Sequence, residues 1–219
     1  MSVTGSGPWT VTYTLTAALA FGQTVIIRYG DNSSGGTAVA PSAGQSGNYV
    51  FTTQQKSTTG GTLTTVSGTQ TVAVNNSADG SGTNGVSPNT AVTSSTDNTL
   101  TFTYTAAAGG MNAGEIRIAV PAGWTTPQTG NNTAAGYVTH SGGGGVSVIG
   151  SEIVISNLTL AHNATVTVIY GDTQSGTVPG AAAAAPGAGE TSTFTTQQKS
   201  TSGGTLTSIA VQPTVTVSP

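Results

Sequence analysis

The stretch FTTQQKSTTGGTLT, residues 51–64, returns as FTTQQKSTSGGTLT at residues 194–207 with a single substitution. The match continues upstream of each copy, because LAFGQTVIIRYGD at residues 19–31 aligns with LAHNATVTVIYGD at residues 160–172. Self-similarity at a fixed spacing is the signature of a protein built from repeats. The duplication therefore involves a long structural segment and not one short motif.

The segment from about residue 77 to residue 145 has no counterpart elsewhere in the chain. SVTGS at residues 2–6 corresponds to SVIGS at residues 147–151, which extends both copies to their upstream ends. The order is therefore second half, first half and second half of one module. We expect a partial, second-half module at residues 1–76 and a complete β-sandwich module at residues 77–219.

Apolar residues alternate with threonine along several short runs, which is the pattern of a strand with one face in the core and one in water. Such runs include Trp9 to Leu15, Leu100 to Tyr104, Ile116 to Val120 and Val166 to Tyr170. Clusters of Gly, Asn, Asp and Ser separate them and predict turns. The run Ala181–Ala185 lies between two Pro-Gly pairs and is predicted to be a loop.

Roughly nine or ten such strands per module predict an all-β fold of antiparallel, immunoglobulin-like β-sandwich modules in tandem. A parallel β-helix is the competing interpretation of a Gly- and Thr-rich β sequence. It requires a rung-length period, which the sequence does not show.

The succession NTLTFTYTAAAGG, GEIRIAVPAGW, NLTLAHNATVTVIYGD and STFTTQQKS resembles the tandem immunoglobulin-like modules of large secreted bacterial surface proteins, such as adhesin stalks and cell-envelope repeat proteins. The resemblance covers nearly the whole chain, and Val120 to Trp124 and Tyr170 to Asp172 are its most specific pieces. It implies extracellular modules that act as spacers or adhesive units, and it carries over no catalytic residue.

Charged residues make up 5% of the 219 residues, against about 25% in ordinary soluble domains. Four scattered basic residues form no patch that could neutralise several phosphates, which argues against nucleic-acid and anionic-membrane binding. A neutral surface rich in hydroxyl and amide groups suits neighbouring repeat modules, other copies of the chain, or cell-wall and host glycans. No apolar run approaches the roughly 20 residues of a membrane-spanning helix.

Nothing at the N-terminus resembles a signal peptide, and the absence of cysteine is compatible with export. We expect a fragment of a longer protein located outside the cell or at its surface.

Catalytic residues are not evident, and we expect no enzyme. Neither His140 nor His162 lies in a recognisable motif, and His162 corresponds to Phe21 in the other copy, which indicates a loop position. A glycosidase-type carboxylate pair, Glu115 with Glu152, rests on composition alone and stays open.

Three aromatic residues could form exposed platforms for stacking on a sugar ring: Trp9, Trp124 and Tyr137. Burial in a core is the alternative for each of them. A carbohydrate- or wall-binding module is therefore a rival to the structural role.

Two oppositely charged pairs occupy matched positions in the copies: Asp31 with Lys56, and Asp172 with Lys199. Three hypotheses fit them. Each lysine guards an edge strand against intermolecular pairing, or forms a salt bridge with the aspartate, or is joined to an Asp or Asn side chain by an isopeptide bond.

No cofactor is expected, although calcium stays open at the loops beginning at Asp31, Asp79 and Asp172. Each loop offers one carboxylate, fewer than calcium sites usually supply. An Asx-turn, in which the side chain accepts a backbone N–H, is the favoured interpretation.

Residues 1–76 lack the strands predicted at Leu100–Thr105 and Ile116–Val120, so their apolar faces need cover. Either a compact smaller sandwich forms around Trp9, or strands of another chain are added at the edges. The sequence favours a stalk or spacer unit, with a self-assembling fibre or surface-lattice subunit as the further alternative.

Overall fold

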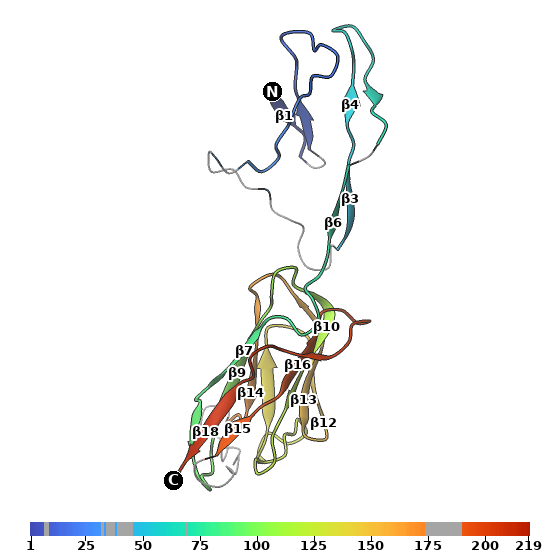
Figure 1. Cartoon of the computed structure of the whole chain (residues 1–219). Coiled ribbons are helices and arrows are strands. Elements are labelled where there is room, and N and C mark those ends of the chain that lie inside the picture. Colours follow the sequence, from blue (N-terminus) through green and yellow to red (C-terminus); the bar gives the residue numbers. More distant parts are fainter. Residues whose placement is uncertain (7–8, 32, 34–37, 39–45, 69, 174–189) are drawn as a thin grey trace. The chain divides into compact units, whose positions relative to one another are not determined.

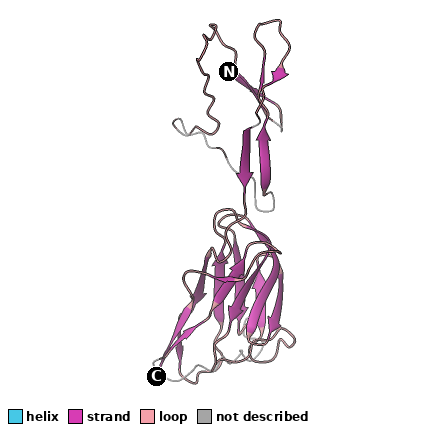
Figure 2. Ribbon diagram, turned by 45° about the vertical axis from the view of Figure 1, so that its right-hand side comes forward, coloured by secondary structure: helices cyan, strands magenta, loops and turns pink. Residues whose placement is uncertain are grey.

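The computed structural model describes residues 1–6, 9–31, 33, 38, 46–68, 70–173 and 190–219. It divides into two compact units, Met1–Ala40 and Pro41–Pro219. Every regular element in the described residues is a strand, coloured magenta in Figure 2, so the predicted all-β class is confirmed. The predicted boundary between residues 76 and 77 separates two halves of the sequence repeat and stays a prediction. The run Ala181–Ala185 lies outside the described residues.

The second unit contains a β-sandwich with two main sheets, whose strands run side by side in Figure 1. The first sheet has the order β11-β14-β9-β7 and the second β12-β13-β10-β16-β17. All pairs within both sheets are antiparallel. The strands of the first sheet are β7 (Thr83–Ser87), β9 (Leu100–Thr105), β11 (Val138–Ser141) and β14 (Thr165–Tyr170). Those of the second are β10 (Met111–Ala119), β12 (Gly145–Ile149), β13 (Glu152–Leu160), β16 (Thr196–Lys199) and β17 (Thr207–Ser208).

A third, three-stranded sheet contributes Ala91, Val215 and Val217 to the same core. It has the order β15-β18-β8, with β15 (Thr191–Thr193), β18 (Thr214–Ser218) and β8 (Thr90–Val92). β18 and β8 run parallel, a departure from the purely antiparallel prediction. The described part of residues 77–219 thus has twelve strands, β7 to β18, more than predicted because several are only two or three residues long.

The core follows the predicted alternation. Leu100, Phe102 and Tyr104 of β9 are buried and face Ile116 and Ile118 of the second sheet across one continuous cluster, while Thr103 between them is exposed. Burying an aliphatic or aromatic side chain of this size contributes about 1.5–3 kcal/mol. The apolar positions on alternate residues therefore determine which face of each strand points inward.

Phe194 lies at the centre of this cluster and is fully buried. Its ring centroid is 5.0 Å from that of Phe102 on the first sheet and 5.3 Å from that of Trp124. Tilted and edge-to-face contacts at these distances are favourable because of the ring quadrupoles. Phe194 belongs to the repeated block, and it fixes that block against strands from residues 77–145.

The described part of residues 1–76 forms three two-stranded sheets. Their strands are β1 (Ser2–Thr4), β2 (Thr10–Thr12), β3 (Gly47–Phe51), β4 (Gln54–Gln55), β5 (Thr64–Thr65) and β6 (Gln70–Val74). None of these described residues belongs to the buried core. Trp9 is 65% exposed, so of the two alternatives for residues 1–76 the compact sandwich around Trp9 is wrong: the described residues supply too few strands to cover it.

The same three hairpins occur in the sandwich. β3–β6 corresponds to β15–β18 and β4–β5 to β16–β17, and each cross-strand partner is shifted by 143 residues. β1–β2 corresponds to β12–β13, since Ser2 opposite Thr12 matches Ser147 opposite Val154, with the turn of β1–β2 lengthened by three residues. Local pairing is therefore the same in both copies, and the difference lies in the partners from residues 77–145.

Substitution of the two equivalent phenylalanines tests this difference. We expect Phe194→Ala to lower the free energy of unfolding of the sandwich by about 3–5 kcal/mol, because a buried aromatic side chain leaves a cavity. The matched control Phe51→Ala removes a side chain that is 49% exposed and is expected to change it by less than about 0.5 kcal/mol. Urea denaturation followed by circular dichroism measures both, and equal losses would contradict the assignment of the core.

Candidate functional site

Trp124 is buried and does not form a platform for a sugar. It is 7% exposed, and its Nε1 donates a hydrogen bond of 2.8 Å to Ser192 Oγ. The stacking hypothesis for Trp124 is therefore wrong, and the core alternative holds. The reason is that the indole packs against the buried ring of Phe194 in an edge-to-face contact within the core.

Tyr137 is half-buried beside β11. Its backbone carbonyl accepts hydrogen bonds from the N–H groups of Gly171 and Asp172, at 2.9 and 3.0 Å. These contacts fix the backbone at the end of β14 and assign no role to the ring. Sugar stacking on Tyr137 stays a prediction.

Trp9 lines a hollow of about 380 Å³ in the first unit. The other lining residues are Met1, Val3, Val11, Ile27, Arg28, Tyr29 and Gly30. By the alignment of the copies, Ile27 and Tyr29 correspond to Val168 and Tyr170, which are 2% and 0% exposed in the sandwich. The hollow is therefore mainly lined by side chains whose equivalents are buried in the core of the sandwich. Among its aromatic side chains, only that of Trp9 has no equivalent in the other copy.

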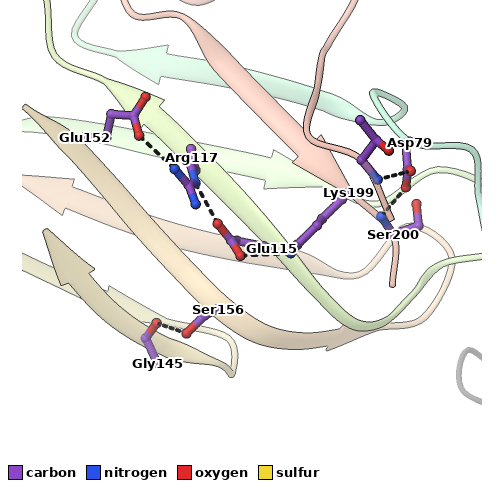
Figure 3. A network of polar contacts seen from close by, with 9 residues as sticks. Asp79, Glu115, Arg117, Gly145, Glu152, Ser156, Lys199 and Ser200 are labelled. Carbon is purple, nitrogen blue, oxygen red and sulfur yellow. Dashed lines mark hydrogen bonds and ion pairs between the residues drawn. The ribbon is translucent and has the colours of Figure 1, made fainter. Parts of the chain in front are cut away.

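Lys199 forms an ion pair with Glu115 and not with Asp172. Lys199 Nζ lies 3.2 Å from Glu115 Oε2, and Arg117 connects Glu115 to Glu152 through contacts of 2.6 and 3.1 Å (Figure 3). The carboxylate of Asp172 accepts a hydrogen bond of 2.5 Å from Thr139 Oγ1 on the first sheet.

The register of the second sheet explains this cluster. Lys199 on β16 stands directly opposite Glu115 on β10, and Arg117 follows Glu115 on the same outward face. β16 is an inner strand between β10 and β17, so the edge-strand role proposed for Lys199 is wrong. In the other copy Lys56 Nζ donates to the carbonyl of Thr59 at 2.7 Å, and Asp31 accepts from a neighbouring backbone group.

The charges determine how Glu115 titrates. Burial acts to raise its pKa, but the hydrogen bonds from Arg117 and Lys199, with their positive charges, outweigh burial and hold the pKa below its ordinary value of 4.5. The hydrogen bond to Glu115 in turn raises the pKa of Arg117. Arg117 bonds to both carboxylates, so Glu115 and Glu152 are joined in one ion cluster, and a glycosidase role for the two stays an untested hypothesis.

The aspartates of the candidate calcium loops each accept hydrogen bonds from the protein. Asp31 Oδ1 accepts the backbone N–H of Ser33 at 2.9 Å, which is the predicted Asx-turn. Asp79 accepts the backbone N–H groups of Ser200 and Thr205, both at 2.7 Å, and so ties the start of the first half to the loop after β16 (Figure 3). Within the described residues, no group of three or more potential metal ligands occurs.

The histidines lie apart from this charge cluster. His162 is exposed in the turn before β14, as its alignment with Phe21 indicated. His140 on β11 is half-buried, and its Nε2 is 3.2 Å from the carbonyl oxygen of Gly144. The contact of His140 is therefore with a backbone carbonyl and not with an ionisable side chain.

Sequence reasoning missed the roles of Glu115 and Asp79. Glu115 and Arg117 flank the inward Ile116 on one strand, so the alternation alone could have placed both on the outer face. No local signal links Asp79 to residues more than 120 positions away.

Comparison with known proteins does not assign this chain to a family. A scan against protein-family models finds no match, and a search of curated proteins finds none either. In the described part of the chain, no helix has the length and apolar character needed to cross a membrane.

The charge cluster predicts a pH dependence. Because the folded-state pKa of Glu115 is lowered, its contribution to stability is fully present above the ordinary value of 4.5 and is lost as pH falls through the folded-state value. We expect Glu115→Gln to destabilise the chain by about 1 kcal/mol at pH 7, and by less at pH 3. Urea denaturation at the two pH values measures this, with the exposed Asp97→Asn as the control. A loss that is independent of pH would contradict the ion-pair role.

Proposed function

We propose that this chain is a non-enzymatic, extracellular structural repeat unit that serves as a stalk or spacer of a cell-surface protein. The parallel pairing of β8 with β18 carries this proposal. It joins the second strand of the sandwich to its last strand, close to the two ends at which a tandem protein under tension is pulled.

The pairing has the geometry of a shear clamp. Thr216 N–H donates to the carbonyl of Asn89 at 2.9 Å, and Thr93 N–H donates to the carbonyl of Ser218 at 2.8 Å. Because the strands are parallel, force on the start of β8 and the end of β18 acts along the strands. The hydrogen bonds are then loaded together rather than one after another.

The packing of β18 against the core also supports a role as a stalk or spacer. Val215 and Val217 on β18 are fully buried in the common core, so β18 cannot slide without exposing them. The outward Thr214 and Thr216 are exposed and uncharged. Such a strand resists extension and presents a hydroxyl-rich surface to its surroundings.

Single-molecule stretching tests the proposal. The chain has no cysteine, so handles can be attached at Ser77→Cys and Pro219→Cys. We expect one cooperative rupture of the sandwich at high force. Thr216→Pro removes the N–H bonded to Asn89 and is expected to lower the rupture force, whereas the matched Thr216→Ala keeps this N–H and the force. Extension without a resistive event would reject the stalk function.

A glycan and cell-wall polymer array separates the spacer from the rival carbohydrate-binding module. We expect no specific ligand, and no difference between the chain and its Trp9→Ala variant. A ligand that binds the chain and is lost with Trp9→Ala would instead make the hollow in the first unit a sugar site.

A further inference from the structure

The repeated strands have partners in the sandwich that are missing in the N-terminal copy. β16 pairs with β17 on one side and with β10 on the other, and β18 pairs with β15 and with β8. The equivalent strands β4 and β6 pair with β5 and β3 alone among the described residues. Both missing partners, β10 and β8, belong to residues 77–145.

Side-chain exposure follows the missing partners. Val72 on β6 is 52% exposed, whereas its equivalent Val215 is fully buried. Gln55 on β4 is exposed, whereas Gln198 is fully buried. The edge of β6 thus corresponds to the edge of β18 that β8 covers, and the edge of β4 corresponds to the edge of β16 that β10 covers. An uncovered strand edge of this kind is a template for pairing with another segment.

The polar groups at this edge also fit one occupant. Lys56 corresponds to Lys199, whose ammonium meets Glu115 of β10. Ser57 and Thr62 correspond to Ser200 and Thr205, whose backbone N–H groups meet the carboxylate of Asp79. A segment like residues 77–120 would therefore bring one carboxylate to Lys56 and another to the loop after β4.

We infer that the two hairpins β3 with β6 and β4 with β5, residues 47–68 and 70–74, form an acceptor site for the first half of another module, a polypeptide with the strand sequence of residues 77–145. A second copy of this chain does not supply such a segment without loss. Residues 1–219 hold one first half and two second halves, so a copy of these residues that donated its first half would uncover its own sandwich. The partner is therefore a module whose first half is not paired with a second half of its own. This inference does not depend on the proposed function as a stalk or spacer.

The test adds another copy of the first half, residues 77–145, to the full chain. Residues 77–145 are fused in front of residue 1, which gives two first halves and two second halves. We expect the backbone amides of β4 and β6 to become protected from hydrogen exchange at least tenfold, with no change in β16 and β18. The control fusion carries Ile116→Asp and Ile118→Asp in the added copy alone, and is expected to give no protection.

A disulfide establishes the register. Glu115 and Lys199 are direct partners in an antiparallel pair, whose Cα separation of about 4.5–5.5 Å suits a disulfide. A cysteine at Glu115 of the added copy is expected to form a disulfide with Lys56→Cys, detected by mass spectrometry of tryptic fragments, and not with Gly60→Cys.

Three results would overturn the inference. Unchanged exchange in β4 and β6 would show that the edge accepts no first half. A disulfide with Lys199→Cys in preference to Lys56→Cys would show that the added copy only replaces the resident first half. Equal disulfide formation with Lys56→Cys and Gly60→Cys would show contact without a register.

Discussion

The structure depends on pairing between strands from the two halves of a module. β10 lies between β13 and β16, and β9 lies between β14 and β7, so residues 77–145 supply a central strand to each main sheet. A two-stranded hairpin is marginally stable in water by itself. The hairpins of the repeated segment become part of a sandwich only when β9 and β10 cover Phe194 and its neighbours.

The same pairing organises the polar surface. Once β10 lies beside β16, Glu115 stands opposite Lys199, and Arg117 joins Glu115 to Glu152. Partly exposed ion pairs contribute little each. Their arrangement instead favours one register, because a shift of one residue would turn Glu115 and Arg117 inward and Ile116 outward. In a chain with so few charges, the cluster marks the junction between the halves.

The alternating pattern predicted β9, β10 and β14, and it placed the inward residues of all three correctly. It failed for the run from Trp9 to Leu15, where a strand forms only at Thr10–Thr12. Alternation reports which face of a strand would be buried, but it does not supply the neighbouring strand. For the charged residues, the matched Asp–Lys pairs suggested a bond within one copy, whereas the true partner of Lys199 lies in the segment without a counterpart.

The sequence by itself determined the class of fold, the duplication and the local hairpins, since these depend on side-chain alternation and turns within a few residues. Only the tertiary structure decided burial. Phe51 and Phe194 stand in nearly the same fourteen-residue sequence and in hairpins of the same register, yet one is half exposed and the other fully buried. The physical reason is that burial requires atoms on the opposite side, and those atoms come from strands distant in the chain.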